Sequence, residues 1–249
     1  MTAAPLSPAL DAALAAVAAR RPLLVASDYD GVLARLRDDP GAAVPEPGVA
    51  EALTRIAAVD GVTVALVSGR GVEDLRRTSG LSGPFRWVGS HGAEHDGPLT
   101  GNLAGVRDHL AALLAPEVGR TPGARLEIKP ASVAVHVRQV TDRDAAADLL
   151  SRARELVDSS LTLKPGKDVL EIAVTDADKG SALRRLVGDL GAVAAVYLGD
   201  DVTDEDGFRA LEPDDVTIKV GAGDTAARYR VADVPGAVAV LEHLADLLA

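Results

Sequence analysis

Residues 23–31 read LLVASDYDG, a short apolar run that ends in two aspartates and a glycine. An apolar run of this length that stops at a polar loop is typical of a buried strand in a parallel sheet. Asp28 and Asp30 stand just past the predicted strand. One carboxylate could attack a phosphorus atom while the other handles the proton of the leaving group. An isolated pair of this kind is more often a helix cap or a loop acid, so its meaning depends on the rest of the chain.

Alternating strands and helices follow this segment and predict a Rossmann-like parallel sheet with helices on both faces. The predicted strands are residues 62–67, 87–88, 193–198 and 216–220, and the predicted helices are residues 47–58, 72–78, 179–190 and 238–248. In such sheets ligands bind outside the carboxyl ends of the strands. Polar side chains follow four of the predicted ends, namely Asp28, Ser68, His91 and Asp200.

The middle of the chain follows a different order of elements, helix-strand-strand-helix-strand-strand. The predicted helices are residues 103–114 and 142–157, and the predicted strands are residues 125–129, 133–138, 161–163 and 169–174. Turns at residues 129–132 and 164–167 would close two hairpins. We therefore expect an α/β core, residues 1–104 and 176–249, and an inserted α+β cap, residues 105–175, with an antiparallel sheet and two helices.

A second acidic cluster follows the predicted strand 193–198. It contains Asp200, Asp201 and Asp204, which a parallel sheet would bring close to Asp28 and Asp30. Carboxylates crowded in this way repel one another unless a cation lies between them. Oxygen ligands without cysteine or histidine suit Mg²⁺. The plainer alternative is that some of these acids occupy the first turn of a helix, where negative charge is favourable.

Groups that could hold phosphate oxygens occur at two further predicted loops. Ser68 offers a hydroxyl with the amide of Gly69 beside it, and Lys179 offers an ammonium group at the start of a helix. Phosphoryl transfer needs such donors around the transferred group. Neither motif means much alone, but each lies at a predicted carboxyl-end loop of the sheet.

In this order, the motifs resemble those of the haloacid dehalogenase superfamily, whose four motifs are matched by residues 28–31, Ser68, Lys179 and residues 199–201. The resemblance implies a Mg²⁺-dependent phosphatase in which Asp28 is the nucleophile and Asp30 is the acid/base residue. It also implies two sets of ligands. Ser68, Gly69 and Lys179 would hold the phosphoryl group, and Asp28, the backbone carbonyl of Asp30 and Asp200 would bind Mg²⁺ with support from Asp201 and Asp204.

The predicted cap strands alternate between apolar and charged residues, which predicts one face against the cap helices and one open face. The open face mixes acids, bases and a histidine, groups suited to binding several hydroxyls. Together with residues 89–94 and 199–206, this pattern is similar to the trehalose-6-phosphate phosphatases. That resemblance implies hydrolysis of trehalose 6-phosphate to trehalose and phosphate, the last step of trehalose biosynthesis. The implied substrate-binding residues are Glu127, Lys129, His136, Arg138, Lys167, Glu171 and His91.

Two alternatives remain open. The chain could act on another sugar phosphate, such as sucrose phosphate or a mannosyl- or glucosyl-phosphoglycerate. It could also be a non-catalytic homologue that senses a sugar phosphate. The intact pair Asp28 and Asp30 argues against the second alternative, because a pure binding protein needs neither a nucleophile nor an acid/base residue.

The composition restricts the classes of partner. The 249 residues carry a net charge of −11 and contain no cysteine. An acidic surface repels nucleic acid, and the lack of cysteine excludes disulfides and thiolate chemistry. No apolar run approaches the length of a membrane span. We expect a cytoplasmic monomer whose partner is a small sugar phosphate rather than nucleic acid or a membrane.

Overall fold

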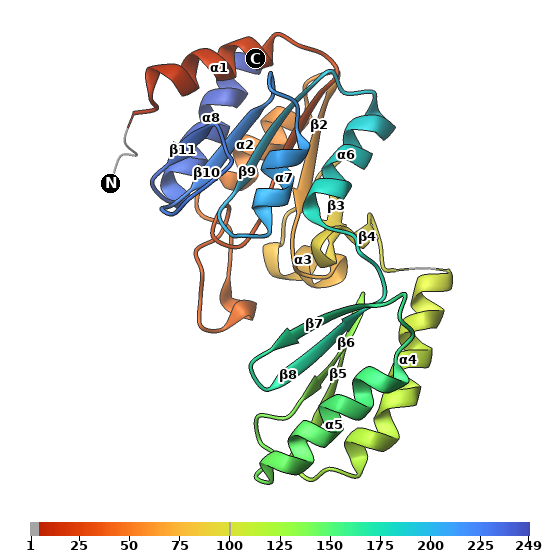
Figure 1. The fold of residues 1–249 in the computed structure, drawn as a ribbon. Coiled ribbons are helices and arrows are strands. Elements are labelled where there is room, and N and C mark those ends of the chain that lie inside the picture. Colours follow the sequence, from red (N-terminus) through yellow and green to blue (C-terminus); the bar gives the residue numbers. More distant parts are fainter. Residues whose placement is uncertain (1–4, 100) are drawn as a thin grey trace. The chain divides into compact units, whose positions relative to one another are not determined.

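The computed structural model describes residues 5–99 and 101–249, which form two compact units (Figure 1). The first unit comprises the chain up to Gly97 and from Ala177 onward, and the second comprises Pro98–Asp176. The second unit begins earlier than the expected residue 105. Gly105 lies within a helix, α4, that starts at Asn102, so a boundary at this residue would cut through the helix.

The first unit contains a seven-stranded sheet in the order β11-β10-β9-β1-β2-β3-β4. Its strands are β1 (Leu23–Ser27), β2 (Val62–Val67), β3 (Arg86–Gly89), β4 (Glu94–His95), β9 (Ala194–Gly199), β10 (Val216–Val220) and β11 (Tyr229–Val231). All neighbours are parallel except β3 and β4. From the central β1 the chain builds outward through β2 and β3 on one side, and through β9 and β10 on the other. This reversal of strand order at β1 creates a crevice at the carboxyl end of the sheet.

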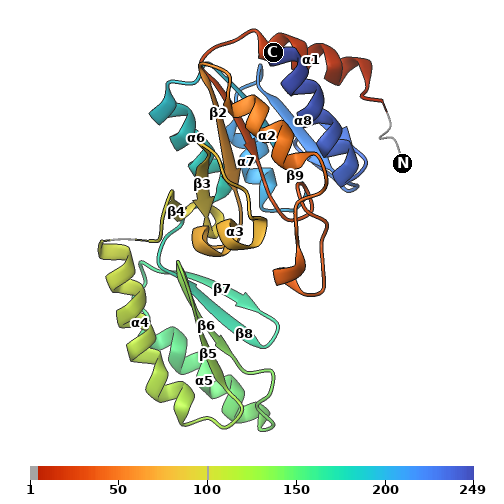
Figure 2. The same cartoon turned by 180° about the vertical axis from the view of Figure 1, so that it is seen from behind.

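Helices cover both faces of this sheet (Figures 1 and 2). The core on one face is formed with α1 (Pro8–Ala18), α2 (Val49–Ala57), α3 (Val72–Ser79) and α8 (Val234–Leu248). The core on the other face is formed with α6 (Lys179–Leu190) and α7 (Asp204–Ala210). Two short 3₁₀ helices, η1 (Pro40–Ala42) and η2 (Ser90–Gly92), lie in the connecting loops. The predicted fold class is confirmed.

The start of α6 is well defined because the sequence supplies both halves of a capping box. The Asp178 side chain accepts a hydrogen bond from the Ser181 amide at 2.6 Å, and the Asp178 amide donates to Ser181 Oγ at 3.0 Å. Such reciprocal bonds satisfy backbone groups that the first turn of a helix leaves without partners. Lys179, the first residue of the helix, is thereby fixed in direction.

The second unit contains a four-stranded antiparallel sheet in the order β5-β6-β8-β7. Its elements are α4 (Asn102–Gly119), β5 (Arg125–Lys129), β6 (Ser132–His136), α5 (Arg143–Leu156), β7 (Thr162–Gly166) and β8 (Val169–Ala173). The predicted turn at residues 164–167 is wrong, because Lys164 to Gly166 belong to β7 and the chain reverses at Lys167 and Asp168. Pro165 misled the prediction, but an edge strand tolerates a proline because one side of it needs no amide donor.

The sequence analysis missed α1 and the short strands β4 and β11, whereas α7 confirms the alternative that some acids of the second cluster occupy the first turn of a helix. Helix α1 is alanine-rich and shows little periodicity, yet it has a conventional start, because Ser7 Oγ accepts from the amide of Leu10 at 3.3 Å. Strand β4 has two residues and β11 has three, too few for any alternation to show. Across residues 5–99 and 101–249, the structure has no helix of the length and apolarity that a membrane crossing requires.

We predict that two glycines of the same helix respond oppositely to alanine. A Cβ at Gly180 would lie 2.5 Å from the carbonyl oxygen of Asp206, whereas a Cβ at Gly188 would meet nothing within 4 Å. Gly180→Ala should lower the free energy of unfolding by about 1–3 kcal/mol through overpacking. Gly188→Ala should raise it by roughly 0.5–1 kcal/mol through helix propensity. Urea unfolding measures both values, and equal effects would contradict the close approach of α6 and α7.

Candidate active site

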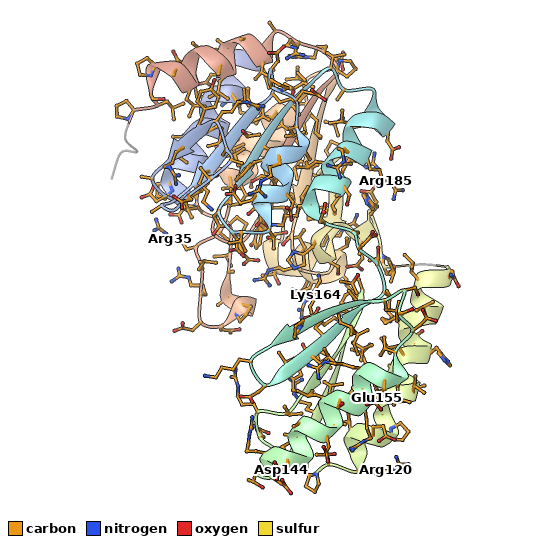
Figure 3. All side chains as sticks on the ribbon, viewed as in Figure 1. Arg35, Arg120, Asp144, Glu155, Lys164 and Arg185 are labelled. Carbon is orange, nitrogen blue, oxygen red and sulfur yellow. The ribbon has the colours of Figure 1, made fainter. Side chains whose placement is uncertain are left out.

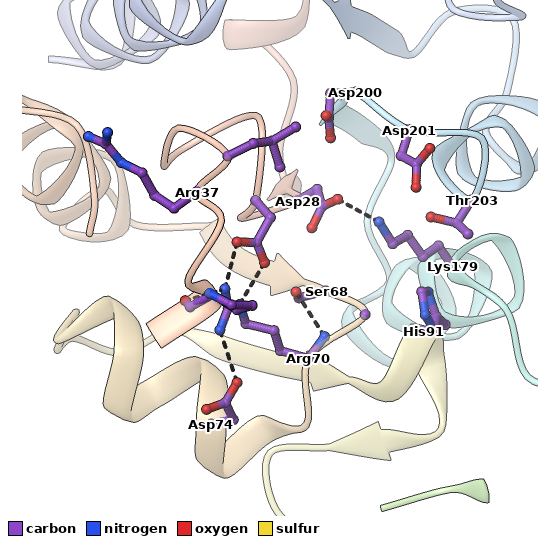
Figure 4. A pocket seen from close by; sticks show the side chains of 14 residues that line it. Asp28, Arg37, Ser68, Arg70, Asp74, His91, Lys179, Asp200, Asp201 and Thr203 are labelled. Atoms are coloured by element: carbon purple, nitrogen blue, oxygen red, sulfur yellow. Dashed lines mark hydrogen bonds and ion pairs between the residues drawn. The ribbon is translucent and has the colours of Figure 1, made fainter. Parts of the chain in front are cut away.

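The ends of three adjacent strands place their polar residues around one cavity in the first unit (Figure 4). Asp28 follows β1, Ser68 follows β2 and Asp200 follows β9. The cavity has a volume of about 590 Å³, and every residue that lines it belongs to the first unit. The reversal of strand order at β1 therefore brings together side chains that are far apart in the sequence.

A buried ion-pair network lies at the floor of this cavity. Lys179 Nζ donates to Asp28 Oδ2 at 2.6 Å and to Asp204 Oδ1 at 2.7 Å. The side chains of Lys179, Asp28 and Asp204 are 2%, 7% and 0% exposed. Burial alone would lower the pKa of Lys179, but the two carboxylates raise it. Removing one partner of such a network leaves an uncompensated buried charge, which typically costs about 3–5 kcal/mol.

The Asp28 carboxylate is fixed at both oxygens. Oδ1 accepts from the amide of Tyr29 at 2.6 Å, while Oδ2 accepts from Lys179. Burial raises the pKa of Asp28 to about 8, and the Lys179 ammonium group opposes this rise. A cation beside Asp28 would favour its charged form.

Asp204 has a different character from Asp28, because its oxygens are engaged with groups of the chain. Oδ1 accepts from Lys179 and from the Tyr197 hydroxyl. Oδ2 accepts from the amides of Asp200 and Asp201 at 3.0 and 2.9 Å. These contacts orient the loop after β9 and leave Asp204 poorly placed to serve as a direct ligand.

Carboxylate oxygens of Asp28, Asp200 and Asp204 all lie within 4.8 Å of one another. Burial, together with the neighbouring Asp204 carboxylate, raises the pKa of Asp200 to about 6. Lys219 donates to the backbone carbonyl of Asp200. Even with both lysines counted, the carboxylates here outnumber the ammonium groups. The all-oxygen donor set and its excess negative charge fit a hard divalent cation.

Asp201 and Asp30 were also predicted to lie near the metal, and their side chains make other contacts. The Asp201 carboxylate accepts from the amide of Val202 at 2.7 Å, beside its own backbone. The Asp30 side chain is not part of the triad of Asp28, Asp200 and Asp204, and it points instead to Arg70. Only its backbone carbonyl had been expected to bind metal, so the side chain is available for another role.

Both oxygens of Asp30 are held by Arg70, a residue that the sequence analysis did not select. Arg70 Nε donates to Asp30 Oδ2 at 2.6 Å and Nη2 donates to Oδ1 at 2.8 Å. Arg70 follows Ser68 and Gly69 directly, so its place in the same loop was a usable signal.

The remaining predicted core residues line the same cavity. Ser68 is 1% exposed, and its Oγ accepts from the amide of Arg70 at 3.2 Å. A Cβ at Gly69 would lie 2.6 Å from Cε1 of His91, so only glycine fits against that ring. Gly31 has a φ of 75° and abuts the Asp200 carboxylate, so it requires glycine for both conformation and space.

Four of the other predicted residues lie on the open face of the sheet in the second unit, namely Glu127, Lys129, His136 and Glu171. Arg138 and Lys167 lie in the segments beyond its strands. The opposite face is apolar, with Val133, Val135, Leu170 and Ile172 fully buried. Figure 3 shows Lys164 on the open side of this sheet, away from α4 and α5. The alternation read from the sequence therefore gave the correct assignment of faces.

An ion pair and a hydrogen-bonded histidine–glutamate pair organise this open face. Glu171 accepts from Lys129 Nζ at 2.8 Å and from Ser132 Oγ at 2.7 Å. His136 Nε2 lies 2.7 Å from Glu127 Oε2. Burial would raise the pKa of Glu171, but its hydrogen bonds with Lys129 and Ser132 lower it. Ser132 was missed, although it lies opposite Lys129 in the hairpin register.

Arg138 and Lys167 do not join these pairs. Both side chains are exposed, and both lie close enough to Asp168 to lower the pKa of its carboxyl group, to which Arg143 donates the main hydrogen bond. The structure thus separates the six predicted residues of the second unit into two bonded pairs and two exposed cations.

Comparison with known proteins identifies the family. The Trehalose-phosphatase family model matches residues 26–235. A trehalose-phosphate phosphatase of Mycobacterium marinum is 34% identical over 238 residues, which cover 85% of this chain and 60% of that protein. A trehalose-6-phosphate phosphatase of Escherichia coli is 30% identical over 232 residues, which cover 89% of this chain and 86% of that protein.

A solved structure agrees with these matches. The trehalose-6-phosphate phosphatase of Aspergillus fumigatus has a TM-score of 0.74 and 25% identity, covering 95% of this chain and 97% of that one. The predicted family is therefore confirmed, and the chain spans about 60% of the length of the M. marinum relative. On the family model and the two relatives, this chain belongs to the trehalose-phosphatase family.

Proposed function

We propose that this chain hydrolyses trehalose 6-phosphate to trehalose and phosphate through an aspartyl-phosphate intermediate on Asp28, as the last step of trehalose biosynthesis. The observation that carries the proposal is the Asp28 carboxylate, held by Lys179 and lying beside Asp200 at the carboxyl end of β1. The names of the M. marinum and E. coli relatives support the choice of substrate.

The proposed first half-reaction is attack by an Asp28 oxygen on phosphorus. The bond from phosphorus to the sugar oxygen breaks, and Asp30 gives its proton to that oxygen. In the second half, water attacks the phosphorus of the acyl phosphate and loses a proton to Asp30. The bond to Asp28 then breaks and inorganic phosphate leaves, so both aspartates return to their starting forms.

The transferring phosphoryl group would be held by Lys179 and by the hydroxyl of Ser68, with the amide of Gly69 beside it. Charge on the equatorial oxygens is then neutralised by groups already in place, which is the main contribution of a protein to this reaction. Lys179 suits the role because its ammonium group is directed by two carboxylates and cannot turn to solvent. His91, from the wall of the same cavity, would contact the substrate.

A divalent cation is implied by the family and fits the acidic triad. We propose Mg²⁺, held by Asp28, Asp200 and the backbone carbonyl of Asp30. Asp201 and Asp204 would support these ligands by orienting the loop after β9. When bound, the ion supplies charge neutralisation for the nucleophile and for the phosphoryl group.

The open face of the second unit would read the sugar. Glu127, Lys129, His136 and Glu171 present paired donors and acceptors, which suit sugar hydroxyls, and Arg138 and Lys167 add two exposed cations. We propose the unit Pro98–Asp176, which contains the expected residues 105–175, as the cap. The partner of the chain would be a small sugar phosphate rather than nucleic acid, whose long run of phosphates the net charge of −11 repels.

Asp28→Asn should abolish turnover of trehalose 6-phosphate, by at least about 10³-fold, because an amide is no nucleophile toward phosphorus. Phosphate release measures turnover, and circular dichroism checks that the isosteric variant is folded. A variant that keeps substantial activity would refute the assignment. If the wild-type protein binds trehalose 6-phosphate but does not hydrolyse it, that result would favour the sensing alternative.

Asp200→Asn should raise the Mg²⁺ concentration that gives half-maximal activity by roughly 10–100-fold, because one charged ligand is lost. The same variant should lose most of the rise in melting temperature that Mg²⁺ gives the wild type. Asp206→Asn is a matched control, since Asp206 is exposed on α7 and lies outside the acidic triad. An unchanged Mg²⁺ requirement in Asp200→Asn would remove this residue from the ligand set.

Glu171→Gln should lower kcat/KM for trehalose 6-phosphate by about 10–100-fold and leave p-nitrophenyl phosphate nearly unaffected, because the latter has no sugar to read. Glu155→Gln is the control, since Glu155 lies on α5, away from the open face (Figure 3). Sucrose phosphate and glucosyl-phosphoglycerate belong in the same panel. Equal or greater turnover of either would identify a different sugar.

A further inference from the structure

Arg70 lies beside the proposed acid/base residue, in the loop after β2, and its side chain is only 11% exposed. Two of its nitrogens hold the two oxygens of Asp30, at 2.6 and 2.8 Å. A planar guanidinium that donates two parallel hydrogen bonds fixes the plane of a carboxylate as well as its position. The direction of Asp30 is therefore set by Arg70.

Arg70 is itself held by three other groups. Nη1 donates to Asp74 Oδ2 at 3.0 Å (Figure 4), and Nη2 donates to the carbonyl oxygen of Pro40 at 2.8 Å. The guanidinium carbon lies 5.8 Å from the centroid of the Tyr29 ring, which is fully buried. With partners in α3, in η1 and beside β1, the guanidinium is anchored independently of Asp30.

The direction of Asp30 matters only for the part of the reaction that needs its proton. A sugar alkoxide is a poor leaving group, and a positioned acid accelerates its departure by about 10²–10⁴-fold. A p-nitrophenolate ion leaves readily without a proton. A residue that acts by orienting Asp30 must therefore affect alkyl phosphates far more than p-nitrophenyl phosphate.

We propose that Arg70, oriented by Asp74, is a positioning residue that holds the Asp30 carboxyl group in one orientation at the wall of the cavity. This inference rests on the proposed phosphatase function and adds a residue to it. The side-chain hydrogen bonds of Arg70 go to Asp30, Asp74 and the carbonyl oxygen of Pro40, so we assign it an indirect role. Its effect passes through Asp30.

The first test compares two substrates in the full chain with Mg²⁺. Arg70→Gln should lower kcat/KM for trehalose 6-phosphate by about 10²-fold and for p-nitrophenyl phosphate by less than about threefold. Arg70→Lys should not restore the loss, because an ammonium group does not hold both oxygens of Asp30 in one plane. Asp74→Asn, which leaves Arg70 and Asp30 in the chain, should show the same selectivity with a smaller loss, of about tenfold.

The second test is a double-mutant cycle. If Arg70 acts through Asp30, Arg70→Gln should cause no further loss on trehalose 6-phosphate once Asp30→Asn is present. A further loss in the double variant would overturn the inference. Two other results for Arg70→Gln would also overturn it. An equal loss of kcat/KM on both substrates would indicate a structural or phosphate-binding role. A gain of kcat/KM on trehalose 6-phosphate would indicate that Arg70 restrains Asp30.

Arg35→Gln is the matched control for loss of a forked ion pair. Arg35 holds Glu46 through two hydrogen bonds, at 2.8 and 3.1 Å, and does not line the cavity. Its replacement should leave kcat/KM for both substrates unchanged, and thermal unfolding of both arginine variants shows whether each is folded.

If the wild type turns over neither substrate, or Asp28→Asn stays active, the proposed function fails and the inference with it. If Asp28 is required but Arg70→Gln lowers kcat/KM for both substrates equally, only the proposed role of Arg70 is refuted.

Discussion

The active-site region depends on one buried lysine. Lys179 joins the end of β1, through Asp28, to the start of α7, through Asp204, while it forms the first turn of α6. Its ammonium group compensates carboxylates that could not otherwise be buried together. Asp204 in turn holds the amides after β9 and so places Asp200. A single cation thus aligns three segments, one of which lies about 150 residues from the others in the chain.

The same network would link the proposed catalysis to stability. An acidic triad with only lysine for compensation keeps a surplus of negative charge, and burial raises the pKa values of Asp28 and Asp200 to about 8 and about 6. A bound divalent cation would relieve that surplus. Metal binding and stability would then be linked through the same carboxylates.

Much of the architecture could be predicted from local patterns. Strands β2, β5 and β10 and helix α6 match their predicted bounds because strong apolar periodicity is bounded by glycine, proline or a capping residue. The short strands β4 and β11 could not be predicted, since their pairing depends on neighbours distant in sequence. Proline at position 165 suggested a turn, and only its place on an edge strand makes it acceptable there.

The motif residues predicted for the site lie together around one cavity, whereas residues that act through others were not predicted. Asp28, Ser68 and Asp200 follow strand ends and Lys179 begins a helix, so they could be selected by position. Arg70 had only its place beside Ser68 and Gly69 as a signal, and the importance of Ser132, Tyr197 and Lys219 lies in which atoms they contact. The engagement of Asp204 with lysine, tyrosine and two amides is likewise a matter of three-dimensional contacts, and it distinguishes this residue from Asp200.

The capping box of α6 has an evolutionary consequence. The chain returns from the second unit at Asp176, and Asp178 with Ser181 fixes the helix start by purely local hydrogen bonds. Lys179 therefore takes its direction from its own helix and its two carboxylates rather than from the preceding domain. Substitutions throughout Pro98–Asp176 should therefore leave the proposed phosphate-binding residue in place. If that unit reads the sugar as proposed, sugar preference could diverge while the chemistry of phosphate removal is inherited unchanged.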